Sequence, residues 1–379
     1  MWKILFIFGT RPEAIKLCPV ALNLRAGAAQ FQVKVCVTGQ HRVLLDQVLA
    51  AFEVQPDYDL DLMLPDQTLF QSTSRILAGL EPVLAAERPD MVLVQGDTTT
   101  TLCGALAAFY RRIPVGHVEA GLRTGDMGQP FPEEMNRVLT GHLASLHFAA
   151  TEGAASNLRA EGVDPSRIAV TGNTGIDAVL YVRDGLEQGR LRGMEWPHLD
   201  RTKKLIGVTA HRRESFGEGF ERICSALARL ARREDVQIVY PVHPNPNVLE
   251  PVNRHLSGLA NVWLREPLSY VSFVDLMRRA DFLITDSGGI QEEGPSLGKP
   301  ILVMREKTER PEAVVAGTVK LVGTSEQAIV EQATILLDDR EEYRRMSRVH
   351  NPYGDGRASD RIRDLILTFF TENQQSQKA

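Results

Sequence analysis

The stretch DFLITDSGGIQEEGPSLGKP, residues 281–300, has the pattern of a strand, a turn of small residues and a short helix. Its apolar run ends at Thr285, Ser287-Gly288-Gly289 follows, and the apolar spacing of 290–297 predicts a helix. Helix N-termini present backbone N–H groups and partial positive charge, so this turn can bind phosphate. The pattern also fits an ordinary strand–helix turn whose glycines only satisfy backbone geometry.

Short apolar runs of this kind recur along the chain and alternate with segments of helical spacing. Nearly continuous apolar runs are typical of parallel strands covered on both faces. We therefore expect an α/β fold of two Rossmann-like, doubly wound domains. In the first half the predicted strands are 3–8, 33–38, 91–94, 115–118 and 146–149, and the predicted helices are 13–26, 42–52, 68–87 and 99–110. In the second half the predicted strands are 204–208, 236–240, 261–264, 282–285, 301–303 and 319–322.

Small residues cluster around Gly172 and mark the expected domain boundary. We predict an N-terminal Rossmann-like domain at 1–172 and a C-terminal one at 173–356. A last helix, 357–371, follows the breaker NPYGDG and is expected to return to the first domain. The two domains are expected to face each other across a central cleft.

Composition narrows the class of protein. The 379 residues are 43% hydrophobic and 24% charged, as in soluble globular proteins. A net charge of −5 gives no basic surface for nucleic acid. The four cysteines form no C-x-x-C pair, which indicates reduced thiols in a cytoplasm, and no apolar run approaches the ~20 residues that cross a membrane.

Charged residues follow the predicted strands of the first half, where ligands bind in parallel sheets. Arg11 and Lys16 follow the first strand, and Asp97 and Glu119 follow two later ones. Crowded carboxylates raise one another's pKa, which suits proton transfer. Asp97 and Glu119 could also be N-caps or ion-pair partners. For the Glu133-Glu134 pair, the structural alternative is that both carboxylates do no more than complement a helix dipole.

The second half adds His211 and Arg310 to the Ser287-Gly288-Gly289 turn. Guanidinium groups and backbone donors match the oxygens of a diphosphate. His211 could instead only cap the segment 212–216. No His, Asp and Glu cluster has metal-ligand spacing, and no G-x-G-x-x-G follows the first strand, so we expect neither a metal nor an organic cofactor.

Several longer motifs occur in order over nearly the whole chain. They include FGTRPEAIKLCPV (8–20), VQGDTTTTL (94–102), GHVEAGLRTGD (116–126), PFPEEMNR (130–137), TAHRRESFG (209–217), TDSGGIQEEGPSLGKP (285–300) and EKTERPEAVVAGTVKLVG (306–323). With these motifs the chain resembles the bacterial non-hydrolysing UDP-N-acetylglucosamine 2-epimerases. The resemblance implies domains arranged as in B-type glycosyltransferases, a UDP-sugar substrate and a homodimer, with no membrane or nucleic-acid partner.

The reaction that the resemblance implies is reversible inversion at C2, from UDP-N-acetylglucosamine to UDP-N-acetylmannosamine. UDP is eliminated to leave 2-acetamidoglucal and then adds back, and the product is a precursor of cell-surface polysaccharide. By motif, the resemblance implies catalytic roles for Asp97, Glu119, Glu133 and His211. It implies substrate binding by Arg11, Lys16, Arg137, Phe273, Ser287, Gly288, Gly289, Glu293 and Arg310, with Glu293 at the ribose and Phe273 beside the uracil. Which carboxylate serves which face of the sugar stays open.

Gln40-His41-Arg42 matches the motif of a second, activating substrate site in some members of the family. Val43 stands where activated members are expected to have a polar residue, which argues against activation. Three other hypotheses remain: a 2-epimerase for a modified UDP-sugar such as a diacetamido uronate, a glycosyltransferase of the same fold, and a non-catalytic nucleotide-sugar binder.

Overall fold

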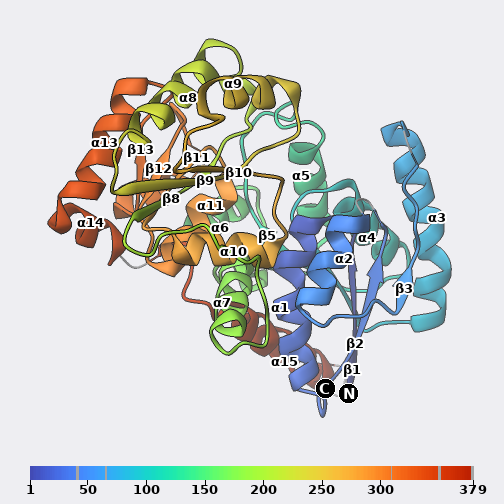
Figure 1. The fold of residues 1–379 in the computed structure, drawn as a ribbon. Coiled ribbons are helices and arrows are strands. Elements are labelled where there is room, and N and C mark those ends of the chain that lie inside the picture. Colours follow the sequence, from blue (N-terminus) through green and yellow to red (C-terminus); the bar gives the residue numbers. More distant parts are fainter. Residues whose placement is uncertain (40–41, 65, 309, 349–350, 377–379) are drawn as a thin grey trace. The chain divides into compact units, whose positions relative to one another are not determined.

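The computed structural model describes residues 1–39, 42–64, 66–308, 310–348 and 351–376. The chain folds into two compact units, Met1–Ala178 together with Gly354–Ala379, and Val179–Tyr353 (Figure 1). The strand pairs described in both units are parallel. This architecture confirms the α/β fold class predicted from the apolar runs. The change of unit falls inside α7 (Thr174–Glu187).

The first unit is built on a seven-stranded sheet in the order β3-β2-β1-β4-β5-β6-β7. Its strands are β1 (Trp2–Phe8), β2 (Phe31–Val37), β3 (Tyr58–Asp59), β4 (Met91–Gln95), β5 (Val115–Ala120), β6 (Leu146–Ala149) and β7 (Ile168–Val170). The central strand β4 is buried along its whole length, which explains an apolar run without alternation. The edge strands β3 and β7 escaped prediction because two or three residues carry no recognisable period.

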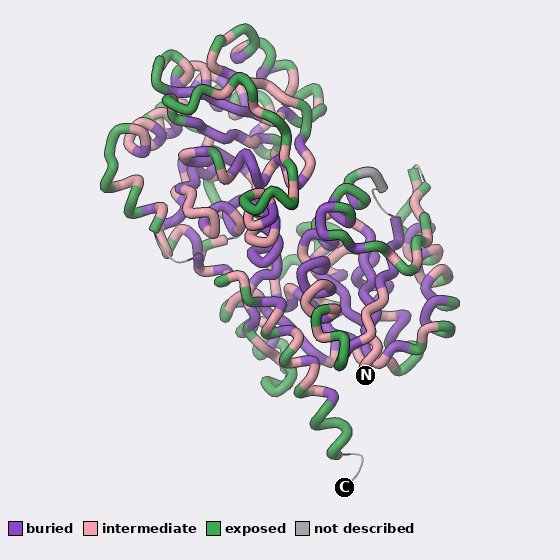
Figure 2. The backbone as a smooth tube through the Cα atoms, turned by 60° about the horizontal axis from the view of Figure 1, so that its bottom comes forward, coloured by how far each residue is buried: buried purple, intermediate pink, exposed green. Residues whose placement is uncertain are grey.

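Helices pack around this sheet and leave its strands in the buried interior of the unit (Figure 2). They are α1 (Arg11–Ala26), α2 (Arg42–Ala51), α3 (Leu69–Glu87), α4 (Thr99–Tyr110), α5 (Glu133–Leu143), α6 (Glu152–Ala160), α15 (Ala358–Ser376) and the 3-10 helix η1 (Pro165–Arg167). The last helix, α15, packs against α1. The rings of Trp2 and Phe370 stack with centroids 4.2 Å apart, and Asn23 donates to Asp360 at 2.9 Å.

The second unit is built on a six-stranded sheet in the order β10-β9-β8-β11-β12-β13. Its strands are β8 (Lys204–Thr209), β9 (Val236–Pro241), β10 (Val262–Arg265), β11 (Phe282–Thr285), β12 (Ile301–Val303) and β13 (Val319–Leu321). Its helices are α8 (Glu218–Leu230), α9 (Pro246–Leu256), α10 (Tyr270–Arg279), α11 (Gly288–Glu293), α12 (Pro311–Ala316), α13 (Glu326–Asp338) and α14 (Arg340–Ser347), with 3-10 helices η2 (Arg213–Ser215) and η3 (Gly294–Leu297). One large apolar core holds one face of this sheet against α8, α9 and α13.

The stretch 281–300 folds as β11, α11 and η3. The predicted helix 290–297 therefore starts two residues earlier, at Gly288, and changes to 3-10 geometry at Gly294, just before Pro295. Proline removes a backbone donor, so it favours a new helical start over continuation of the first helix. All four cysteines are buried and free, in agreement with the predicted reduced thiols.

Candidate functional site

In the first unit, β1, β4 and β5 are neighbours in the sheet, so the loops that follow them leave the same edge. Lys16, on α1, places its Nζ 2.6 Å from both carboxylate oxygens of Glu119, at the end of β5. Gln95, the last residue of β4, donates to the same carboxylate. Glu119 has φ of 62°, an unusual conformation for a residue other than glycine. The edge thus holds a carboxylate whose position is fixed by two donors and by the backbone.

Asp97 lies in the loop after β4, beside this pair. Its Oδ2 forms an ion pair of 2.8 Å with Arg137 of α5, and its backbone carbonyl accepts from Asn136 at 2.9 Å. Burial raises the pKa of Asp97 to about 6, Arg137 and Lys16 oppose that rise, and the charges of Glu119 and Glu133 add to it. A carboxyl group with this pKa can accept or release a proton near neutral pH.

The adjacent residues Glu133 and Glu134 have different environments at the start of α5. Glu134 is buried, and its Oε1 accepts from the backbone N–H groups of Thr124 and Gly125 at 3.0 Å. Its Oε2 lies 3.5 Å from Arg137. Glu134 therefore organises the loop after β5, whereas the half-buried Glu133 is close enough to Asp97 to affect its pKa.

In the second unit, the Ser287-Gly288-Gly289 turn leads directly into α11. Ser287 occupies the N-cap position, yet its hydroxyl makes no capping bond to the helix. A Cβ on Gly289 would meet no atom of the described residues within 4 Å, so its backbone is open to a ligand. A Cβ on Gly288 would lie 3.3 Å from the guanidinium carbon of Arg310, whose Nε donates to Glu292 at 2.7 Å. The turn, a hydroxyl that does not cap the helix and a guanidinium are thus together.

His211 lies directly opposite this turn within the same unit, because β8 and β11 are adjacent. Its backbone N–H donates to Asp286 Oδ2 at 2.6 Å, and its ring stacks on that of His243 with centroids 5.7 Å apart. Partial burial lowers the pKa of His211, against the raising effect of Asp286. The backbone N–H of Asn245 donates to His243 Nδ1 at 3.2 Å, so His243 stabilises its own turn.

The other predicted residues lie on the same elements. Arg11 is half-buried at the first position of α1, and Glu293 is half-buried on α11 next to Glu292. Phe273, on α10, lines a small apolar cavity with Thr209 and Thr285. The structure therefore forms two groups, one in each unit: Arg11, Lys16, Asp97, Glu119, Glu133 and Arg137 in the first, and His211, Phe273, Ser287, Gly288, Gly289, Glu293 and Arg310 in the second.

Comparison with known proteins identifies the family. A family model described as UDP-N-acetylglucosamine 2-epimerase matches residues 24–367. The chain belongs to this family. An Escherichia coli K12 protein named UDP-N-acetylglucosamine 2-epimerase is 60% identical over 369 residues, which cover 96% of this chain and 98% of that one.

Solved structures agree with this family. The UDP-GlcNAc 2-epimerase of Neisseria meningitidis, solved with UDP-GlcNAc bound, is 48% identical with a TM-score of 0.88, and the match covers 97% of this chain and 100% of that one. The glycosyltransferase SnogD of Streptomyces nogalater matches with a TM-score of 0.57 over 96% of this chain and 99% of its own. At 16% identity this second likeness shows the shared fold alone. The expected relation to glycosyltransferase folds is thereby confirmed.

Two buried carboxylates of this 2-epimerase-family chain were not predicted as site residues. Glu13 accepts from the backbone N–H groups of Gly9 and Thr10 and from the hydroxyls of Thr98 and Thr101, so it ties the loop after β1 to the loop that carries Asp97. Burial raises the pKa of Glu13, although these hydrogen bonds lower it. The Thr-x-x-Glu capping box was the available signal in the sequence.

Asp286 is the second unpredicted carboxylate. It is fully buried and accepts from the backbone N–H groups of His211 and Arg212 at 2.6 and 2.7 Å. Its Oδ1 lies 3.5 Å from His211 Nδ1 and has no hydrogen bond in the described chain. Asp286 therefore orients the His211 loop, and its place directly before Ser287 was the only sequence clue.

The expected activator motif, a metal site and a membrane-spanning helix can each be checked against the residues that the structure describes. Gln40 and His41, the centre of the expected activator motif, lie outside those residues, and the side chains of Arg42 and Val43 are not described either. Within the described ranges, no three His, Cys, Asp or Glu side chains gather in a group that could hold a metal ion. None of the helices seen there is long and apolar enough to cross a membrane.

Proposed function

We propose that this chain catalyses the reversible C2 epimerisation of UDP-N-acetylglucosamine to UDP-N-acetylmannosamine. The observation that carries the proposal is the group of Lys16, Asp97 and Glu119 at one sheet edge, with an Asp97 pKa of about 6. The Neisseria meningitidis relative, named for this reaction, was solved with UDP-GlcNAc bound. The Ser287 turn supplies the donors that a diphosphate needs.

The C2 hydrogen is not acidic enough to be removed directly as a proton, so the proposed route eliminates UDP as the C2–H bond breaks. A carboxylate removes the C2 proton, the electron pair of that bond forms the C1=C2 double bond, and the C1–O bond breaks to release UDP. The products held at the site are UDP and 2-acetamidoglucal. UDP then adds back to C1 while a proton reaches the opposite face of C2. Asp97, Glu119 and Glu133 are proposed to carry these protons, with His211 beside the diphosphate or sugar.

The proposed substrate site divides its tasks between the two units. Arg11, Lys16 and Arg137 would neutralise charge around the sugar and diphosphate. Ser287, Gly288, Gly289 and Arg310 would bind the phosphates, Glu293 the ribose hydroxyls, and Phe273 the uracil face. The proposed domains are 1–172 with 357–371, and 173–356.

The direct test is incubation with UDP-N-acetylglucosamine in deuterium oxide. Epimerisation through C2 deprotonation puts deuterium at C2 of both sugar nucleotides, which proton NMR detects as loss of the C2 signal. Mannosamine isomer formed without solvent deuterium would contradict the mechanism. Absence of any isomer would contradict the function.

A modified UDP-sugar, such as a diacetamido uronate, is the second candidate substrate. The candidate site contains several cations, Arg11, Lys16, Arg137 and Arg310, that could also serve a carboxylate at C6 of the sugar. Comparing kcat/KM for the two nucleotide sugars distinguishes the candidates. A glycosyltransferase would instead transfer sugar to an acceptor without C2 exchange.

Activity should depend on pH through Asp97. The pKa of its carboxyl is raised to about 6, so the group is protonated below that pH and is a carboxylate, the form that accepts a proton, above it. We therefore expect kcat/KM to rise with pH through an apparent pKa of about 6. Because Arg137 lowers the pKa of Asp97, Arg137→Met should move this acid limb to higher pH. Rate profiles between pH 4.5 and 8, roughly, with circular dichroism of the variant, test both expectations.

The Ser287 turn is proposed to retain UDP while 2-acetamidoglucal exists. Ser287→Ala removes a hydroxyl that makes no capping bond, so the helix should stay intact. We expect this variant and Glu293→Ala to release more free UDP and 2-acetamidoglucal per epimerisation event. Chromatography of the reaction mixture measures both. Slow turnover without either product would contradict retention, and Ser166→Ala, on the exposed η1 turn, serves as the control.

Three further parts of the proposal come from other observations: the cytoplasmic location from the cysteine usage, and the homodimer and the pathway from the family resemblance. We infer that the chain is cytoplasmic, forms a homodimer and supplies a precursor of cell-surface polysaccharide. Light scattering of the purified chain tests the dimer. Loss of polysaccharide in a deletion strain, restored by the wild-type chain, tests the pathway.

A further inference from the structure

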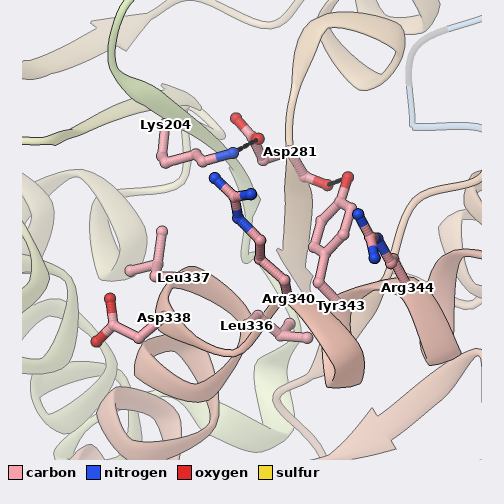
Figure 3. Close-up of a pocket in the computed structure, with 8 residues that line it drawn as sticks. All are labelled: Lys204, Asp281, Leu336, Leu337, Asp338, Arg340, Tyr343 and Arg344. Carbon is pink, nitrogen blue, oxygen red and sulfur yellow. Dashed lines mark hydrogen bonds and ion pairs between the residues drawn. The ribbon is translucent and has the colours of Figure 1, made fainter.

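A pocket of about 380 Å³ opens on the second unit, at the amino ends of β8 and β11 (Figure 3). Lys204 begins β8 and Asp281 directly precedes β11, whereas His211 and Ser287 follow the carboxyl ends of the same strands. A six-residue strand is roughly 20 Å long, so the pocket is separate from the proposed UDP site. Its volume lies within the range of small-molecule sites.

The carboxylates at this pocket already have partners. Asp281 accepts from Lys204 Nζ at 2.8 Å and from the backbone N–H of Leu205 at 2.9 Å, one bond to each oxygen. Both oxygens of Asp338 accept from Arg233, at 2.8 and 2.7 Å. Neither carboxylate is left to pair with another cation at full strength.

Two arginines at the pocket have no such partner. Arg340 and Arg344 lie one turn apart on α14, and neither side chain has a hydrogen bond or ion pair within the described chain. Arg345, on the same helix, forms a two-point ion pair with Glu342 at 2.7 Å. In Figure 3 the Arg340 guanidinium points toward the Lys204 ammonium, and Arg344 extends beside the hydroxyl end of Tyr343. The two guanidinium groups thus lie near the Lys204–Asp281 pair, and neither has an acceptor of its own within the described residues.

The remaining wall is apolar. Leu336, Leu337 and the ring of Tyr343 line the pocket, and the Tyr343 hydroxyl is occupied because it donates to the Asp281 carbonyl at 3.0 Å. Two planar guanidinium groups and an ammonium offer more donors than one carboxylate can accept, whereas a phosphate monoester has three terminal oxygens and a charge near −2. A ligand that satisfies the whole lining therefore combines a phosphate with an apolar body.

From this lining we infer that the pocket is a binding site for a small organic phosphate monoester. Arg340 and Arg344 bind the phosphate with Lys204 beside it, and the organic part packs on Leu336, Leu337 and the Tyr343 ring. The site is independent of the 2-epimerase proposal, because it shares no residue with the proposed UDP site.

The experiment titrates phenyl phosphate into the full chain by calorimetry, with UDP present at saturation to occupy the proposed nucleotide site. We expect saturable binding that persists under UDP. Arg340→Gln and Arg344→Gln each remove charged hydrogen bonds to the phosphate, so each variant should bind phenyl phosphate about tenfold more weakly or worse. Arg348→Gln replaces an exposed arginine just past the same helix and should leave binding unchanged.

Comparison ligands test the two halves of the site. Inorganic phosphate should bind more weakly than phenyl phosphate because it lacks the apolar part, and benzoate should bind more weakly because it has fewer acceptor oxygens. Arg340 and Arg344 are exposed, so thermal melts should show the variants folded. The inference is overturned by any of three results: no saturable binding to the wild type, competition by UDP, or unchanged binding in the Arg340→Gln/Arg344→Gln double variant.

Discussion

Asp97→Asn should lower kcat by about a hundredfold or more, because a positioned acid or base contributes about 10²–10⁴-fold to a proton-transfer step. Asparagine has nearly the shape of aspartate and keeps the backbone contact from Asn136, but it cannot accept the C2 proton. It also removes the ion pair of 2.8 Å with Arg137. The substitution therefore tests whether catalysis needs the negative charge of Asp97 beside Lys16 and Glu119.

Two measurements distinguish a catalytic loss from a structural one. Deuterium exchange at C2 should fall together with kcat, while the binding of UDP, assigned to the second unit, should change little. Asp364→Asn is the matched control and should retain full activity, because this carboxylate is exposed on α15 and pairs with its neighbour Arg363. Wild-type exchange in Asp97→Asn would remove this residue from the mechanism.

Glu119→Gln is expected to have an effect of similar size, again about 10²–10⁴-fold in kcat. Glutamine has the same side-chain length as glutamate and places no further demand on the backbone, whose φ of 62° is strained for either residue. The fold should therefore accept the substitution. It removes the negative charge that meets Lys16 Nζ at 2.6 Å through both oxygens. Proton transfer and the placement of the Lys16 charge should both be impaired.

A second consequence of Glu119→Gln concerns the pKa of Asp97. The Glu119 charge raises that pKa, so its removal should lower it and move the acid limb of residual activity to lower pH, opposite to Arg137→Met. Opposite shifts in the two variants cannot come from a general loss of structure. Glu161→Gln, which breaks the Arg123 pair on the exposed side of the same unit, is the control and should leave the limb in place. A limb unmoved by Glu119→Gln would contradict the electrostatic coupling.

Much of the fold could be predicted from local pattern. The apolar runs 146–149, 282–285 and 301–303 match β6, β11 and β12 residue for residue, because strands covered on both faces are apolar throughout. The edge strands β3 and β7 could not be predicted, because strands of two or three partly exposed residues are too short to show a periodic pattern. The helix after Ser287 was predicted, but not its change to 3-10 geometry at Gly294.

The candidate site was predictable in its residue types and loops, and less so in its pairings. Glu133 and Glu134 are neighbours with the same chemistry, yet the backbone N–H groups of Thr124 and Gly125 occupy only Glu134. On α11, Arg310 donates to Glu292 and so distinguishes the environment of this residue from that of its neighbour in the sequence. Nothing in the sequence distinguishes such neighbours, since the distinction lies in which groups the fold brings opposite them.

The sequence by itself determined the strand–turn–helix of 281–300, the parallel α/β class and, through its ordered motifs, the 2-epimerase family. These features depend on residues close together in the chain, where periodicity and turn chemistry act directly. Only the tertiary structure decided that Lys16 meets Glu119 across 103 positions of sequence and that Asp286 holds the His211 loop. It also decided that Arg340 and Arg344 have no ion pair with any residue that the structure describes. The physical reason is that sheet order sets which loops become neighbours, and hydrogen bonds and charges act only over a few ångströms.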